Sequence, residues 1–247
     1  RHYRRQRQMC IRDRLETNTF ELTLPSSDVK VKYRPFLVKE EKILLQAMES
    51  QEQKQIVQAL KDIVSVCTYG QLNVDELPTF DLEYIFLQIR SKSVGEIAKL
   101  KVLCPDTKKD YAEVEVDLST VDVQVDDEHQ NKIMVDEDKK IGVLMKYPTL
   151  ASVDPTKDYS KQNTKALFNI IGEGIYQIFE GDKVHMAKDY TKEELDQFVE
   201  SLDSKSFKKI QRFYETMPKL MHEIEVENPK TKVKSKITLS GLSDFFG

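Results

Sequence analysis

The residues of this sequence best suited to chemistry are its cysteines and histidines, which could bind a metal ion or form a thiol–imidazole nucleophile pair. A tetrahedral zinc site needs closely spaced pairs of ligands, but Cys104-Pro-Asp-Thr107 has Thr where the second Cys would stand. Cys67 is remote from this motif, and the four His residues are widely separated, at His2, His129, His185 and His222. We therefore predict no metal site, no cofactor and no catalytic residue, with Cys67 in the core and Cys104 at a buried strand end.

An enzyme is the third of four function hypotheses, and the fourth, a nucleic-acid binder, depends wholly on residues 1–14. A hydrolase would require Cys67 or Cys104 to meet a distant His and an acidic side chain in one pocket. The sequence around either Cys carries no signature of such an enzyme. The chain is therefore predicted not to be an enzyme and to have no small-molecule substrate.

Two other motifs are too incomplete for ligand binding. Gly172-Glu-Gly174 lies in a helical pattern and matches neither a dinucleotide-binding motif nor a P-loop, so it indicates close helix packing or a kink. Asp126-Asp127 and Asp136-Glu137-Asp138 lack the spacing and the closing Glu of a calcium loop. We interpret both acidic runs as solvated turns.

The charge of the chain favours a protein partner. The 247 residues have a formal net charge of −4, and residues 1–14 contain six Arg and one Asp, so the rest of the chain has a net charge of about −9. An acidic surface disfavours nucleic acid and anionic membranes, because both attract basic patches. No apolar run approaches the ~20 residues that span a bilayer. We therefore predict no nucleic-acid and no membrane partner.

The leader of residues 1–14 shares no pattern with the sequence that follows. Residues 9–13, MCIRD, are what one frame of a common sequencing-library transposon end would encode. We interpret the leader as non-native, a cloning or assembly scar, or as disordered. The alternative is a basic arm that binds nucleic acid.

The elements expected to position any site belong to an α+β fold. Residues 15–95 are predicted to form an N-terminal hairpin, with strands at Phe20–Leu24 and Val29–Tyr33. Two helices or one bent helix are predicted to follow, with a polar patch at Ser50–Gln55 as the point of the break or bend. A further helix is predicted to start after an N-cap at Thr79 and to end around Arg90–Gly95.

Strands are predicted to follow, in a central antiparallel β-meander over residues 96–150. Residues 151–220 are predicted to be a helical segment, with one helix over Lys165–Phe179 and another starting at a capping box, Thr191–Glu194. Residues 221–247 are predicted to form a C-terminal hairpin around Asn228–Thr231, with an aromatic tail.

The candidate partner-contact residues lie in three places: Arg34, Pro35 and Phe36 after the first hairpin; Arg90, Ser93 and Gly95 at a helix end; and Phe245 and Phe246 in the tail. Two adjacent aromatic residues can anchor a partner. The alternative is that the tail folds back on the hairpin core, and that Arg34 and Phe36 cover the first hairpin.

Several segments together resemble the baseplate hub assembly proteins of T-even-like contractile-tailed bacteriophages. They are LTLPSSDVKVKYRPFLVKEEKILLQAMES, LPTFDLEYIFLQIRSKSVGE, CPDTKKDYAEVEVDLS, GVLMKYP and the GLSDFF end, in that order. The resemblance spans most of Phe20–Phe246 and excludes the leader. It carries over no catalytic residue.

The resemblance implies a non-enzymatic late protein that builds the phage tail through contacts with other tail or baseplate hub proteins. We expect a chaperone-like assembly factor in the host cell cytoplasm during tail assembly. The alternative is a permanent structural subunit of the hub, located in the virion baseplate.

Overall fold

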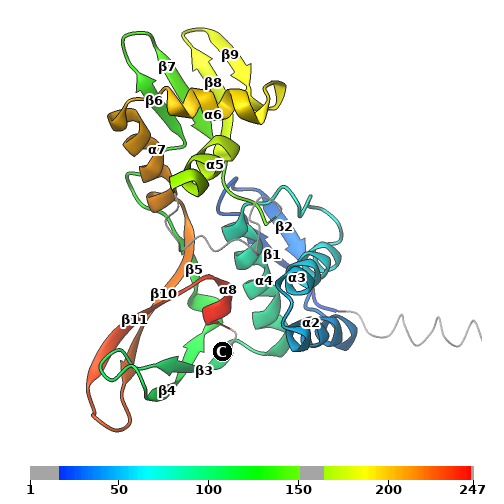
Figure 1. Ribbon diagram of the computed structural model, residues 1–247. Coiled ribbons are helices and arrows are strands. Elements are labelled where there is room, and N and C mark those ends of the chain that lie inside the picture. The colour runs from blue at the N-terminus through cyan, green and yellow to red at the C-terminus, as the bar shows by residue number, and fades with distance from the viewer. Residues whose placement is uncertain (1–16, 151–163, 246–247) are drawn as a thin grey trace, which may run out of the picture.

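The computed structural model describes residues 17–150 and 164–245, and it shows the predicted α+β fold in two lobes, each with its own hydrophobic core (Figure 1). The first lobe contains β1 (Phe20–Thr23), β2 (Lys30–Tyr33), α2 (Val38–Ser50), α3 (Gln53–Cys67), α4 (Thr79–Val94), β3 (Ile97–Leu103), β4 (Tyr111–Asp117), η1 (Leu118–Thr120), β5 (Asp122–Gln124), β10 (Lys219–Glu227), β11 (Lys234–Ser240) and α8 (Gly241–Asp244). The inserted lobe interrupts the first between β5 and β10. It contains β6 (Lys132–Asp136), β7 (Ile141–Met145), α5 (Thr164–Gly174), β8 (Ile175–Glu180), β9 (Lys183–Met186), η2 (Ala187–Asp189), α6 (Lys192–Glu200) and α7 (Ser204–Thr216).

Helix α4 lies at the centre of the first lobe. A helix with apolar side chains on all sides is surrounded by other elements, and the buried apolar residues of α4 are Phe80, Leu82, Ile85, Phe86, Leu87 and Ile89. The elements α3, η1, β5, β10 and α8 all contact it. The N-cap prediction was wrong by one position: Pro78 is the N-cap, and the Thr79 hydroxyl donates to the Pro148 carbonyl oxygen at 2.8 Å.

Of the two alternatives predicted after the first hairpin, the structure has two separate helices. Helix α2 ends at Ser50, Gln51 adopts a left-handed φ of 55°, and α3 begins at Gln53. The core covers only part of the apolar surface of α2, since Leu44 is buried whereas Leu45 and Met48 are 53% and 39% exposed.

Three hairpins of the first lobe share one kind of turn. In each turn, a residue followed by Pro accepts a hydrogen bond at 2.9 Å from the N–H four residues later, and that later residue has a φ between 53° and 60°. The three pairs are Leu24 with Asp28, Cys104 with Lys108, and Asn228 with Lys232. Proline suits the second position of such a turn because its φ is already fixed near −65°. The predicted turns at these places are confirmed.

The strands predicted as one meander over residues 96–150 are divided among three sheets. β3 pairs only with β4, whereas β5 pairs with β10 in the order β11-β10-β5. β6 and β7 belong to the inserted lobe, in the order β6-β7-β8-β9. Alternation in a sequence fixes which face of a strand is buried and says nothing of which strand lies beside it.

The predicted helix over Lys165–Phe179 is also corrected. Helix α5 ends at Gly174, and residues 175–180 form strand β8. Ile175, Ile178 and Phe179 fit helical spacing, but a short apolar run of this kind fits a buried strand equally well.

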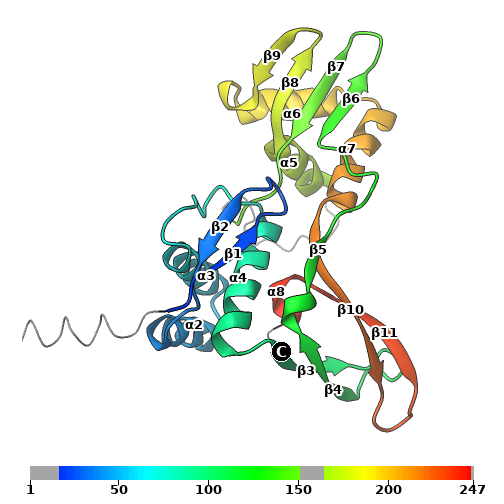
Figure 2. The same cartoon turned by 180° about the vertical axis from the view of Figure 1, so that it is seen from behind.

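The inserted lobe is a four-stranded antiparallel sheet with α6 across one face (Figures 1 and 2). Thr191 and Glu194 form the predicted capping box, with the Thr191 N–H donating to the Glu194 carboxylate at 2.8 Å. Gly174 allows close packing, as predicted. A Cβ there would overlap the Tyr214 hydroxyl oxygen and lie 3.1 Å from Tyr214 Cζ.

An aromatic cluster joins the two lobes. The Tyr147 ring meets Phe80 of α4 edge-on, with centroids 5.1 Å apart, and stacks on Phe213 of α7 at 5.5 Å. The His129 ring lies against those of Tyr147 and Phe213. Its Nε2 is 2.9 Å from the Tyr147 hydroxyl, and its Nδ1 is 3.0 Å from the Thr216 hydroxyl. Packed rings and short hydrogen bonds at this point favour a fixed arrangement of the lobes.

Candidate interaction site on a paired-hairpin arm

The structure brings two of the three predicted contact segments together. The Phe36 N–H donates to Ser93 Oγ at 2.9 Å, and the Ser93 hydroxyl donates to the Ile89 carbonyl at 2.6 Å. The Arg34 guanidinium pairs with Glu40 at 3.2 Å, and the Arg34 side chain is only 11% exposed. The Phe36 contact therefore ties the segment after the first hairpin to α4, and the Arg34 pair ties it to α2. Both residues serve the fold, as the alternative interpretation expected of Arg34 and Phe36.

The remaining predicted contact residues differ in exposure. Pro35 is half-buried, and so is Arg90, whose guanidinium pKa is lowered by burial. Gly95 is exposed and ends α4 with a φ of 128°, a conformation that favours glycine. Phe245 is fully buried in the first core, so its ring offers no surface to a partner in this conformation. Phe246 lies outside the described residues.

The two described thiols are buried, and the imidazoles of His129 and His185 bond neighbouring hydroxyls. Cys67 is buried in the core as predicted, and burial raises the pKa of its thiol to about 11, which leaves it protonated and unreactive at neutral pH. Cys104 is buried at the end of β3, also as predicted. His185 pairs with the Tyr190 hydroxyl at 2.7 Å. Over residues 17–150 and 164–245, no three His, Cys, Asp or Glu side chains gather in a way that could hold a metal ion.

The most developed polar site lies on what we call the arm, which consists of the β3–β4 and β10–β11 hairpins. Figures 1 and 2 show the two hairpins side by side, at the end of the molecule opposite the inserted lobe. A small apolar cluster of its own fills the space between them; its members are Cys104, Ala112, Val226, Val114, Ile224 and Ile237. The arm therefore has an internal core in addition to its backbone pairing.

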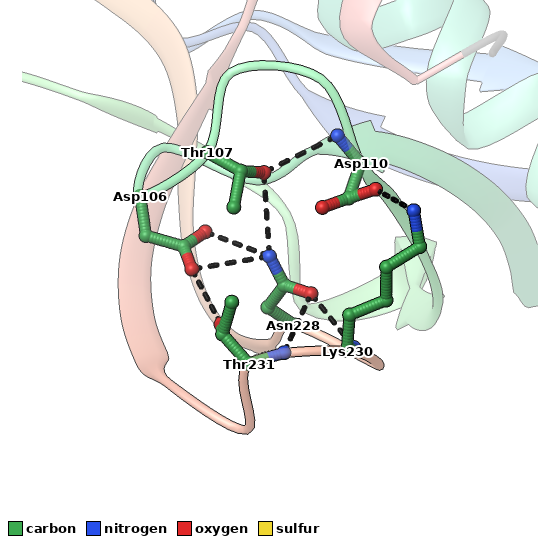
Figure 3. Close-up of polar contacts among 6 residues, drawn as sticks. All are labelled: Asp106, Thr107, Asp110, Asn228, Lys230 and Thr231. Carbon is green, nitrogen blue, oxygen red and sulfur yellow. Dashed lines mark hydrogen bonds and ion pairs between the residues drawn. The ribbon is translucent and has the colours of Figure 1, made fainter.

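Asn228 joins the turns of the two hairpins (Figure 3). Its side-chain nitrogen donates to both carboxylate oxygens of Asp106, at 2.9 and 3.1 Å. Its side-chain oxygen accepts from the N–H groups of Lys230 and Thr231, at 2.9 and 3.3 Å. Asn228 is 1% exposed, and a buried amide that makes all these bonds positions both turns at once.

Four further contacts complete what we call the Asn228 network. The Asn228 side-chain nitrogen also donates to Thr107 Oγ1 at 3.4 Å. The Thr231 hydroxyl donates to Asp106 at 2.5 Å, the Lys230 amine pairs with Asp110, and the Asp110 N–H donates to Thr107 Oγ at 3.3 Å. Figure 3 shows all six side chains converging between the turns. A surface made by both turns is therefore presented as one unit.

The network holds its charged groups in their ionised forms. Hydrogen bonds from Thr231 and Asn228 lower the pKa of Asp106, and the Lys230 amine lowers that of Asp110. Asp110 in turn raises the pKa of Lys230. The arrangement can make ionic and hydrogen-bonded contacts, and it contains no nucleophile activated by a base.

Sequence reasoning identified both turns but did not connect them. The signal that could have found Asn228 is its place before Pro at the start of a turn, where an Asn side chain commonly bonds the backbone two residues on. Its bond to Asp106 depends on the tertiary packing of two separate hairpins, which no local pattern encodes.

Comparison with known proteins matches nearly the whole chain to one family. A family model described as T4 bacteriophage base plate protein matches residues 17–247. Neither the curated proteins nor the solved structures contain a match. In the part of the chain that the structure describes, none of the helices combines the length and apolar character needed to cross a membrane.

Proposed function

This chain belongs to the family of T4 bacteriophage base plate proteins, and from that premise we propose that it is a chaperone-like assembly factor of the baseplate hub. It acts by contact with other baseplate proteins, in the cytoplasm of the infected host cell. The observation that carries the proposal is the arm, a projecting element with its own core and with charged outer faces.

The outer faces of the arm favour contacts that form and release in water. Lys99 pairs with Glu115 at 3.3 Å, Lys101 with Glu113 at 3.7 Å, and Lys236 with Glu223 at 2.6 Å, and all six side chains are more than half exposed. Permanent interfaces are apolar and resemble a domain core, whereas transient ones are polar. An arm covered with ion pairs therefore suits a factor that leaves after assembly.

We also propose that the protein catalyses no reaction, and that it binds neither nucleic acid nor a membrane. The net negative charge of the chain supports the absence of nucleic-acid and membrane binding, because polyanions are bound by basic surfaces. The absence of catalysis is supported by two groups: both ring nitrogens of His129 bond hydroxyls, and the Cys67 thiol is buried and protonated. An uncharacterised hydrolase would need these groups to meet in one cleft.

A permanent hub subunit is the second candidate, and the exposed apolar side chains of α2 favour it. Five of them in and next to α2 are exposed: Leu37, Val38, Ile43, Leu45 and Met48. Interfaces that stay closed are richer in apolar side chains than transient interfaces.

The test is to delete the gene from the phage and to measure two quantities. We expect incomplete baseplate hubs in electron micrographs of infected cells, and little or none of this protein when purified wild-type virions are analysed by quantitative mass spectrometry. Stoichiometric protein in the virion would replace the assembly factor by the permanent subunit. Normal tails without the gene would contradict both.

A further inference from the structure

The end of the arm is a basic region on an acidic protein. Residues 105–110 and 228–234 contain five Lys and two Asp, a net charge of +3, whereas the whole chain has a net charge of −4. We call these lysines the basic tip: Lys108, Lys109, Lys230, Lys232 and Lys234. They come from two turns far apart in the sequence, and the Asn228 network holds these turns together.

The network engages both carboxylates in hydrogen bonds or an ion pair and leaves amines exposed. The Asp110 side chain is 15% exposed, whereas that of its partner Lys230 is 75% exposed. Asp106 is occupied by Asn228 and Thr231. Within the described residues, Lys108, Lys109 and Lys234 are exposed and form no ion pair. Their positive charge is therefore available to a partner.

We propose that the basic tip binds an acidic surface loop of a partner protein. The inference rests on the proposed function only in taking that partner to be another baseplate protein. Opposite charges across an interface speed association and select the partner, which suits an assembly step.

A nucleic acid fits this region less well. The tip contains no Arg, the residue that binds phosphates through two parallel hydrogen bonds. Exposed Glu residues also follow β10 towards the tip, at positions 223, 225 and 227, and they would repel a long polyanion. Of the tip lysines, Lys232 pairs with Glu227 at 3.7 Å. A short acidic loop can instead contact Lys108 and Lys109, which lie on the other hairpin.

The backbone supplies a variant that removes charge without harming the fold. Lys108 and Lys232 have φ values of 53° and 60°, in the left-handed region where glycine is preferred. The double variant Lys108→Gly/Lys232→Gly is therefore expected to fold at least as well as the wild type. The matched control is Lys99→Gln/Lys101→Gln, which removes two exposed lysines from strand β3 of the same arm.

The direct test measures binding of a decaglutamate peptide to the full chain by NMR titration. We expect shifts at the tip, an affinity that falls with added salt, and a loss of about five-fold in the glycine variant but not in the control. Equal binding by the variant and the control would overturn the proposal. So would tighter binding of a ten-nucleotide single-stranded DNA at the tip, which would indicate a nucleic-acid site.

A second experiment tests whether the tip contacts a baseplate protein during infection. Carbodiimide joins amines directly to carboxylates, so cross-linking in infected cells should link tip lysines to Asp or Glu of a baseplate protein. The glycine variant should lose these links and assemble fewer tails. If deletion of the gene blocks assembly but the glycine variant assembles normally, the inference about the tip is wrong and the proposed function stands. If deletion of the gene has no effect while decaglutamate still binds the tip, the proposed function is wrong and the inference that the tip binds acidic segments is retained.

Discussion

The side-chain nitrogen of Asn228 lies 2.9 Å from Oδ1 of Asp106, although 122 residues separate the two in sequence. The bond connects the turn of one hairpin to the turn of another. Asn228 is buried, so removing Asp106 would leave the Asn228 amide without this acceptor in a site closed to water. Removing Asn228 would take away the hydrogen bonds that the two turns share. The contact therefore fixes how the two hairpins of the arm lie against each other.

Replacing Asn228 with Ala should loosen the arm. We expect the free energy of unfolding to fall by about 1–3 kcal/mol, because the Asp106 carboxylate and two backbone N–H groups lose their partner. Urea denaturation measures the loss, and hydrogen exchange should locate it in β3, β4, β10 and β11. The control is Asn73→Ala at an exposed position, and an equal loss in both variants would contradict the role of the network.

Glu83 should make stability depend on pH. Burial raises its pKa from 4.5 to about 7, and it accepts a hydrogen bond from the backbone of Leu242. A carboxyl with a raised pKa takes up a proton on folding, so its contribution is fully present below pH 4.5 and is lost as pH rises through about 7.

Glu83→Gln should remove this dependence, because the neutral amide keeps an oxygen acceptor for Leu242. The variant should be more stable than the wild type at pH 8, and the difference should shrink at pH 5. Thermal unfolding across this range measures it, with the exposed Glu76→Gln as control. A pH-independent difference would show that burial of the charge is not its cause.

Gly174 and Gly172 form a matched pair in one helix. A Cβ at Gly174 would overlap the Tyr214 hydroxyl, whereas at Gly172 it would meet only one Asp196 carboxylate oxygen, at 3.0 Å. We expect Gly174→Ala to destabilise the inserted lobe by about 1–3 kcal/mol through overpacking. Gly172→Ala should be much milder, since Ala also favours the helix. Differential scanning calorimetry compares the two, and equal effects would refute the packing argument.

Phe245 should behave as a core residue. Its ring is fully buried, so Phe245→Ala is expected to cost about 3–5 kcal/mol of the free energy of unfolding, from the lost burial and the cavity left behind. Phe245→Leu keeps most of the volume and should cost less. A variant that folds with wild-type stability but loses contact with baseplate proteins would instead support the aromatic-anchor prediction.

Local signals in the sequence predicted the local structure of this protein well. The capping box at Thr191, the break or bend after Ser50 and the Pro-containing hairpin turns each depend on a few adjacent residues, and each is confirmed. β5 could not be placed, because its partner β10 comes after the entire inserted lobe. The Asn228 network was missed for the same reason, whereas β8 was missed because its apolar spacing suits a helix as well.

The insertion of one lobe into the other sets an order for folding during synthesis. Residues 132–214 form a continuous stretch that supplies the sheet and core of the inserted lobe. The surrounding lobe needs Leu220, Leu239 and Phe245, which the ribosome adds only after the inserted lobe. The inserted lobe can therefore fold on the ribosome while the core of the surrounding lobe is still incomplete. The arm with its basic tip can form only after the whole inserted lobe has been synthesised, because β10 and β11 follow it in the chain.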